Sequence, residues 1–87
     1  MRKLVPTEKF GEELDSLDNT MKMRIVDAIN GKIQKKPELG KPLRHDLAGF
    51  FSERVGKYRI IYQFDQNTVY LLRCRSEEHT LIFSDVN

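Results

Sequence analysis

The apolar residues of this chain change their spacing once, near Gly40, and this change limits the possible folds more than any other feature. Before Gly40, apolar side chains recur every three or four residues, which is typical of one face of an amphipathic helix. The first stripe comprises Phe10, Leu14 and Leu17, and the second comprises Met21, Ile25, Ile29 and Ile33. After Gly40 the apolar period becomes two, which indicates half-buried strands. The sequence therefore predicts helices followed by strands in one α+β domain.

Local signals define where the two predicted helices begin and end. Thr7 offers an N-cap to the first helix, and Asp18 or Asn19 can cap the second. The pair Asn30-Gly31 falls inside the second helix and weakens it by about 1 kcal/mol relative to alanine, but the periodicity resumes afterwards. Pro37 then ends the helix. Because the connection is short, the helices should form an N-terminal hairpin packed on one face of the sheet.

The predicted sheet contains three or four antiparallel strands. The strands that follow the helices span residues 43–55, with Gly49 as a bend or bulge, then residues 58–64 and 68–75, and finally the short segment 81–83. Residues 2–5 are also compatible with a short edge strand that Pro6 terminates.

The positions of charged residues favour one register for the two central strands. A three-residue loop at residues 65–67 places Phe64 opposite Thr68 and Arg59 opposite Arg73. One face then carries the apolar set Tyr58, Ile60, Tyr62, Tyr70, Leu72 and Cys74, and the other carries Arg59, Arg73 and Arg75. A two-residue loop would mix charged and apolar residues, because a slip of one residue turns every side chain of a strand over. We therefore predict the three-residue loop.

Length and composition exclude several classes of protein. With 87 residues, the chain forms a single domain, residues 1–87, with a small core. Its one cysteine, Cys74, cannot form an internal disulfide and is expected to pack in the core. The longest apolar run, residues 69–72, is far shorter than a membrane span, and the N-terminus lacks the apolar stretch of a signal peptide. We therefore expect a cytoplasmic protein that does not bind membranes.

Positive charge is concentrated in the middle of the chain. Residues 41–75 contain seven basic and three acidic side chains, a net charge of +4 against +2 for the whole protein. The basic residues are Lys41, Arg44, Arg54, Lys57, Arg59, Arg73 and Arg75. This excess is typical of a surface that binds a polyanion such as RNA, although stray arginines on a solvated sheet face give the same pattern.

The few side chains capable of chemistry suit RNA cleavage without a metal. The chain lacks the glycine-rich phosphate loops, the metal motifs C-x-x-C and H-E-x-x-H, and G-x-S-x-G, so we expect no metal, no other cofactor and no small-molecule ligand. RNA cleavage requires proton transfer and cations for the phosphorane. Histidine is the side-chain type suited to proton transfer near neutral pH, which makes His45 and His79 candidates; arginines bind phosphate, and Phe83 can stack on a base. Spacing alone is equally compatible with exposed, inactive histidines and with Phe83 in the core.

Two segments carry a resemblance to known proteins. Residues 47–50 read LAGF and residues 53–62 read ERVGKYRIIY, which resembles the L-x-G…R-V-G-x-Y-R-[IV]-x-Y core of the RelE/ParE toxin superfamily. Residues 75–83, RSEEHTLIF, resemble the R-x-x-x-H-x-x-[LI]-F ending of the YafQ-type nucleases. Residues 45–49, HDLAG, resemble the H-x-L-x-G segment of the same nucleases. The resemblance covers nearly the whole chain.

This resemblance implies a RelE-like fold and a toxin of a type II toxin-antitoxin system, neutralised by a cognate antitoxin protein. It implies an mRNA interferase, a ribosome-dependent endoribonuclease that cuts mRNA without a metal and so inhibits translation. In that case His79 transfers protons and Phe83 stacks on a base, while His45 assists in proton transfer or holds the phosphate. Arg59 and Arg75 would stabilise the transition state. The remaining RNA-binding residues would be Lys41, Arg44, Arg54, Lys57 and Arg73.

The superfamily also contains ParE-like inhibitors of DNA gyrase, so a non-enzymatic gyrase inhibitor is the second hypothesis. A third is a toxin homologue that retains only antitoxin binding. The R-V-G-x-Y-R core fits all three, whereas His79 and Phe83 favour the nuclease. In each case, the antitoxin should lie across the sheet and helices and cover Arg59 and Arg75, or displace the final segment.

Overall fold

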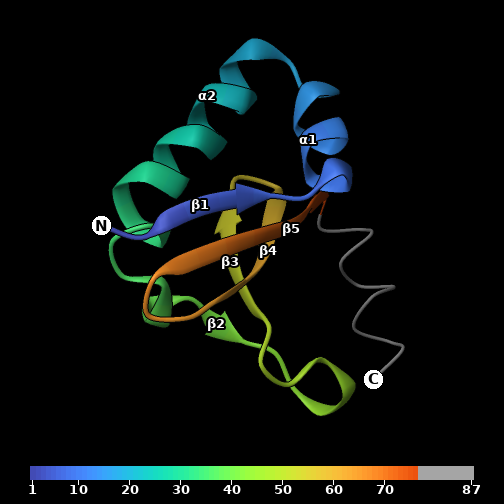
Figure 1. The fold of residues 1–87 in the computed structure, drawn as a ribbon. Coiled ribbons are helices and arrows are strands. Elements are labelled where there is room, and N and C mark those ends of the chain that lie inside the picture. The colour runs from blue at the N-terminus through green and yellow to red at the C-terminus, as the bar shows by residue number, and fades with distance from the viewer. Residues whose placement is uncertain (77–87) are drawn as a thin grey trace.

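The computed structural model describes residues 1–76, in which two helices cover one face of a five-stranded sheet (Figure 1). The helices are α1, Glu8–Asp15, and α2, Asn19–Ala28. The strands are β1, Lys3–Pro6; β2, Lys41–Pro42; β3, Phe51–Val55; β4, Tyr58–Phe64; and β5, Thr68–Ser76. Their order across the sheet is β1-β5-β4-β3-β2. The α+β class and the helical hairpin are therefore confirmed.

Both helices begin at the predicted caps. The side-chain oxygen of Thr7 accepts a hydrogen bond from the Phe10 N–H at 3.1 Å, and Asp18 accepts one from the Met21 N–H at 2.8 Å. After α2 the helix widens into one π-helical turn, Ile29–Ile33, which contains the predicted weak pair. This turn keeps the helical stripe in phase, because both of its end residues remain buried against the sheet.

The sheet is mixed, whereas the sequence predicted three or four antiparallel strands. The short edge strand is present as β1, but it pairs with β5 in parallel, with Lys3 opposite Thr68 and Pro6 opposite Leu71. The chain returns to this edge only after both helices and three strands, so the neighbour of β1 is the last described strand. The Thr7 N–H continues the pairing by donating to the Leu71 carbonyl at 2.9 Å.

The prediction of one strand over residues 43–55 is wrong for its first half. Only β2 and β3 are extended, and the segment between them forms a loop that contains a 3₁₀ turn, His45–Leu47. Two residues in this loop have left-handed backbone conformations, His45 with φ of 59° and Gly49 with φ of 94°, which are incompatible with a strand. The Leu43 N–H closes the loop by donating to the Phe50 carbonyl. The predicted strand at 81–83 lies outside the described residues.

The predicted register between β4 and β5 is also wrong, and two features explain why. The connecting loop is tight: the Asp65 N–H donates to the Thr68 carbonyl, so Phe64 lies opposite Val69. A register shift then skips Leu72 and places Arg59 opposite Arg75 rather than Arg73.

The register shift divides β5 into two parts with opposite alternation. Before the shift, Val69 and Leu71 are buried in the core and Tyr70 is exposed, the reverse of the prediction for these side chains. After the shift, Cys74 is buried as predicted. Because of this bulge, the hairpin has a two-residue turn and still keeps Arg59, Arg73 and Arg75 on the face opposite the core.

The core lies between the helices and this face of the sheet. Its buried members are Phe10, Ile25, Ile29, Ile33, Val55, Ile60, Tyr62, Val69, Leu71 and Cys74. No helix among residues 1–76 is long and apolar enough to cross a membrane.

Tyr62 ties the core to the segment that follows the helices. Its hydroxyl donates a 2.6 Å hydrogen bond to the Pro37 carbonyl, and burial, with smaller contributions from Glu53 and Glu38, raises its pKa to about 12. The same hydroxyl lies against the Cα of Gly40, where a Cβ would overlap it. Gly40 is therefore required by close packing and not by its backbone conformation, which is extended.

Candidate nucleic-acid interface

Three arginines lie directly opposite one another across the central strands. Arg54 of β3 pairs with Arg59 of β4, which pairs in turn with Arg75 of β5. Opposite residues of antiparallel strands have Cα atoms about 4.5–5.5 Å apart and share a face of the sheet. Like charges in such positions destabilise a sheet. This arginine row therefore concentrates positive charge along one line across the sheet.

A second row lies beside the first on the same face. It runs through Lys41 of β2, Ser52 of β3, Ile61 of β4 and Arg73 of β5. Side chains alternate along each strand, so these positions face away from Val55, Ile60 and Cys74, which belong to the core under the helices. We call the surface formed by both rows the arginine face; its cations are Lys41, Arg54, Arg59, Arg73 and Arg75.

Local contacts orient two of the arginines in the row. The Arg54 Nε donates to the Gly56 carbonyl at 3.0 Å, and an Arg59 Nη donates to the Ser52 hydroxyl at 3.3 Å. Ser52 is buried, with 2% of its surface exposed, at the centre of the arginine face. Both acceptors are uncharged oxygens, and these two bonds orient the guanidinium groups.

The side chain of Glu13, on α1, reaches the edge of the arginine face. Glu13 of α1 accepts three hydrogen bonds from Arg73, the shortest being 2.8 Å, and a fourth from the Cys74 N–H at 2.9 Å. Burial acts to raise the pKa of Glu13, but the bonds from Arg73 and Cys74 outweigh it and hold the pKa below the usual value. Glu13 is therefore a carboxylate at neutral pH.

Arg75 also approaches this carboxylate, but less closely. Its Nε lies 3.9 Å from Glu13 and is buried without a hydrogen-bond partner among residues 1–76. A cavity of about 270 Å³ adjoins it, lined in part by Glu13, Tyr58 and Ser76. The two arginines of β5 thus differ: Arg73 is engaged by three hydrogen bonds, and Arg75 by a longer ion pair.

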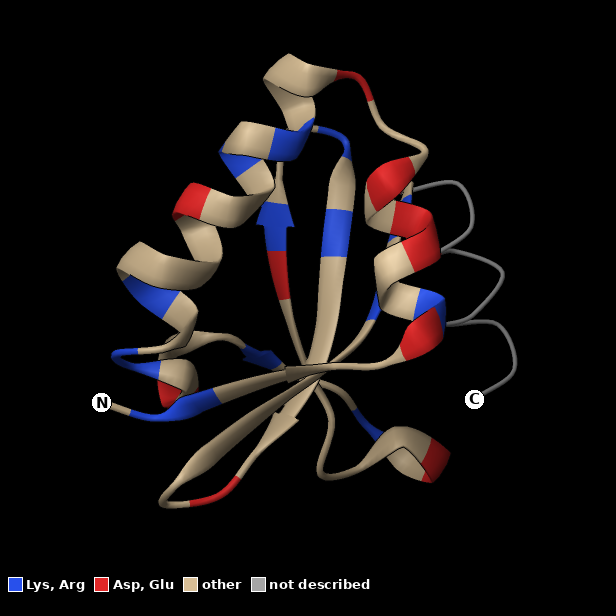
Figure 2. Cartoon of the chain, turned by 45° about the horizontal axis from the view of Figure 1, so that its top comes forward, with Lys and Arg blue, Asp and Glu red and all other residues tan. Residues whose placement is uncertain are grey.

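Charge is divided between α1 and the strands. In Figure 2, the red ribbon segments that mark Asp and Glu dominate α1, whereas the blue segments that mark Lys and Arg lie on several strands and on α2. The acidic residues of α1 are Glu8, Glu12, Glu13 and Asp15. The helix and the sheet therefore present surfaces of opposite sign, and an approaching polyanion is drawn to the sheet.

The predicted site residues do not all converge on the arginine face. Arg44 and His45 are exposed in the loop that precedes β3, whereas Arg54 lies near the other end of that strand. Lys57 occupies the turn after β3, with its ammonium 6.0 Å from the Tyr58 ring centre. His79 and Phe83 lie outside the described residues. No group of three potential metal-ligating side chains occurs within residues 1–76.

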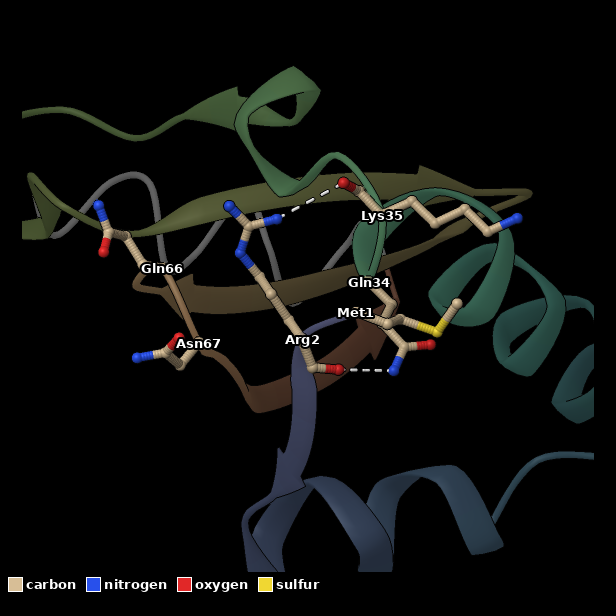
Figure 3. Close-up of a pocket in the computed structure, with 6 residues that line it drawn as sticks. All are labelled: Met1, Arg2, Gln34, Lys35, Gln66 and Asn67. Carbon is tan, nitrogen blue, oxygen red and sulfur yellow. Dashed lines mark hydrogen bonds between the residues drawn. The ribbon is translucent and has the colours of Figure 1, made fainter.

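A larger cavity lies at the opposite end of the β4–β5 hairpin. It measures about 530 Å³ and is lined by Met1, Arg2, Gln34, Lys35, Gln66 and Asn67 (Figure 3). Arg2 extends across it and donates to the Asp65 carbonyl at 2.9 Å, and its guanidinium lies 5.6 Å from the Phe64 ring centre. The Gln34 amide donates to the Arg2 carbonyl at 2.6 Å. These contacts fasten β1 to the end of the π-helical turn and leave the cavity apart from the arginine face.

Sequence reasoning missed two residues of this surface. Glu13 is one of four acidic residues in α1, and no local pattern distinguishes it from the others. Ser52 gives no signal either, since its role depends on the pairing of β3 with β4.

Comparison with known proteins identifies relatives of this chain. Residues 4–80 match the family described as ParE toxin of the type II toxin-antitoxin system, parDE. Toxin RelG of Mycobacterium tuberculosis is 39% identical over 64 residues, which cover 70% of this chain and 74% of RelG.

Solved structures agree with the sequence comparison. The crystal structure of the toxin-antitoxin complex RelBE2 from Mycobacterium tuberculosis contains a chain that is 33% identical, with a TM-score of 0.79 over 86% of this chain and 96% of that one. A YoeB/ParE toxin from Agrobacterium tumefaciens is 26% identical, with a TM-score of 0.73 over 85% of this chain and 96% of that one.

Proposed function

The chain belongs to the RelE/ParE superfamily of type II toxins, and on that premise we propose that it is a ribosome-dependent endoribonuclease that cleaves mRNA. The observation that carries this proposal is the arginine row, Arg54–Arg59–Arg75. Three guanidinium groups at opposite positions of neighbouring strands place several forked donors within reach of one anionic ligand. The phosphates of single-stranded RNA supply closely spaced charges of that kind.

The chemistry assigned to the arginine row is charge stabilisation. When the 2′-oxygen attacks the adjacent phosphorus, negative charge builds up on the phosphorane oxygens before the bond to the 5′-oxygen breaks. Arg59 and Arg75 present planar, charge-assisted donors to these oxygens, while Arg54 and Lys41 hold neighbouring phosphates. The products are a 2′,3′-cyclic phosphate and a 5′-hydroxyl.

Arginine remains protonated at neutral pH, so proton transfer requires another side chain. We assign this role to His79 and base stacking to Phe83, following the resemblance of residues 75–83 to the YafQ-type nucleases. His45, which lies beyond the other end of β3, is assigned with Arg44 and Lys57 to contacts with more distant phosphates. Substitution His79→Ala should abolish cleavage with the fold intact, and full activity in that variant would remove His79 from the mechanism.

An antitoxin is the expected regulatory partner, since the RelBE2 structure is a complex of toxin and antitoxin. The arginine face requires an acidic partner segment to neutralise its charge. Such a segment would cover Arg59 and Arg75 and so block access of RNA. A complex that leaves this face open would contradict the assignment.

Primer extension on a defined mRNA in a reconstituted translation system tests the nuclease directly. We expect cuts at codon-spaced positions that require ribosomes, and little cleavage of the same RNA without them. Arg59→Gln should lose the cuts, whereas Lys35→Gln, a charge-matched control away from the arginine face, should retain them. An uncut message during normal translation would reject the proposal.

A second function, inhibition of DNA gyrase, is favoured by the match to the ParE toxin family. A supercoiling assay with purified gyrase tests it, and normal supercoiling at saturating protein would exclude it. If both assays are negative, the remaining function is antitoxin binding alone.

A further inference from the structure

Glu13 engages the guanidinium of Arg73 as a bound phosphate would. The Arg73 Nε contacts both carboxylate oxygens, at 3.1 and 3.2 Å, and its Nη2 donates to one of them at 2.8 Å. Arginine binds carboxylate and phosphate in the same forked geometry. Arg73 therefore already has an anion as its partner before any nucleic acid arrives.

The backbone fixes this carboxylate in place. β1 pairs with β5 only as far as Leu71, so beyond that point the edge of β5 has no neighbouring strand within the described residues. Glu13 fills the gap by accepting the Cys74 N–H at 2.9 Å, and the Glu13 side chain is only 19% exposed. Moving Glu13 away from Arg73 would leave a partly buried N–H without an acceptor, which is unfavourable.

We propose that Glu13 is a specificity-determining residue that withholds Arg73 from nucleic acid and so weakens the binding of free RNA. While Glu13 holds Arg73, this guanidinium cannot bind a phosphate. This inference rests on the proposed function: if the protein binds free RNA weakly, it cleaves mRNA only when a ribosome holds that mRNA in place. An acidic residue on α1 thereby limits activity on RNA that is not being translated.

The salt dependence of RNA binding reports how many phosphates the protein neutralises, and it does not require cleavage. The probe is a fluorescently labelled single-stranded RNA of about twelve nucleotides, fully 2′-O-methylated so that it cannot be cut, measured by anisotropy over a series of KCl concentrations. For single strands, each phosphate that the protein neutralises contributes about 0.7 to the slope of log K against log salt. The variants compared are Glu13→Gln, Arg73→Gln, their combination, and Arg59→Gln.

Glu13→Gln should steepen the slope by about 0.7 and tighten binding about fivefold at 0.1 M salt, because Arg73 is released. Arg73→Gln should leave the wild-type slope unchanged. In the double variant the part of the gain due to Arg73 should disappear, leaving at most the smaller share of Arg75, whose Nε lies 3.9 Å from Glu13. Arg59→Gln should flatten the slope by about 0.7, which shows that the assay detects the removal of a single cation from the RNA-binding surface. An unchanged slope in Glu13→Gln, or a flatter one in Arg73→Gln, would overturn the inference.

Two controls keep the result interpretable. If Glu13→Gln does not fold by circular dichroism, Arg73→Gln decides alone, because its amide can still donate to Glu13. If wild-type protein fails to cut mRNA on ribosomes but the slopes behave as expected, the proposed nuclease fails while the role of Glu13 in RNA binding is supported. Ordinary cleavage with slopes that contradict these expectations rejects the role of Glu13 only.

Discussion

Ile60 and Ile61 are neighbours in β4 and both are buried, with 0% and 2% of their surface exposed, yet they face different surroundings. Ile60 belongs to the core cluster beneath the helices. Ile61 lies on the arginine face, between Ser52 and Arg73 in its cross-strand row. One face of the sheet thus buries apolar surface and supplies stability. The other face gathers like charges, which we propose serve binding.

The largest expected effect is on the helix-covered face. Ile60→Ala should lower the free energy of unfolding by about 3 kcal/mol, because it leaves a cavity in a close-packed cluster. Ile61→Ala should cost less, since flexible arginine stems beside it can move into the space. Urea denaturation of both variants gives the comparison. Equal losses would show that the two faces are packed alike.

The next prediction concerns the centre of the arginine row. Arg59→Gln should slow cleavage of ribosome-bound mRNA about 100-fold, the effect of removing one donor that stabilises transition-state charge. The same substitution should change the free energy of unfolding by less than about 1 kcal/mol, because relief of a like-charge contact offsets the lost hydrogen bond to Ser52. Lys35→Gln is the matched control. If Arg59→Gln were both unstable and inactive, the prediction that Arg59 serves cleavage and not stability would be wrong.

Gly40→Ala tests the contact that closes the core near Pro37. The added Cβ would overlap the Tyr62 hydroxyl, which is held by its hydrogen bond to the Pro37 carbonyl. We expect a loss of about 2 kcal/mol in the free energy of unfolding, typical of an overpacked core. Gly31→Ala is the control, because nothing lies within 4 Å of that position. Thermal denaturation at one pH distinguishes the two.

The smallest effect is a loss of stability at alkaline pH. Burial raises the pKa of Cys74 to about 11 and that of Tyr62 to about 12, so the unfolded chain ionises first. The stability contributed by these groups is complete below about pH 8, where both are neutral in the folded and the unfolded chain, and it is lost as the pH rises toward the folded values. By pH 10 the loss should be of order 1 kcal/mol. Cys74→Ala should flatten the stability curve above pH 9; an unchanged curve would exclude this cause.

The sequence predicted the helix-covered face better than the arginine face, for a physical reason. Apolar periodicity and the caps at Thr7 and Asp18 are local signals, and the structure confirms both helices. The sequence also correctly predicted that the helix continues through the weak pair Asn30-Gly31. Only the structure shows that it does so as a π-helical turn. Local patterns were therefore enough to predict the helices, because each helix buries one apolar stripe against the sheet.

The register of β5 and the partner of Arg73 depend on contacts between distant segments, which local patterns do not predict. The skipped Leu72 reverses the alternation of β5, and nothing in the residues themselves marks the position of that bulge. The sequence correctly placed Arg59, Arg73 and Arg75 on one face but paired the wrong two across strands. It also did not indicate that Glu13, sixty positions before Arg73, would be the partner of that arginine.

The pairing of β1 with β5 bears on how this protein is made. The Thr7 hydroxyl bonds to the Leu72 carbonyl, 65 positions further along the chain, and Arg75 completes the arginine row only a few residues later. A chain emerging from the ribosome therefore has its first strand and both helices long before it has their final neighbour. Such distant pairing delays folding. The sheet that carries the arginine row therefore cannot be completed until β5 has been synthesised.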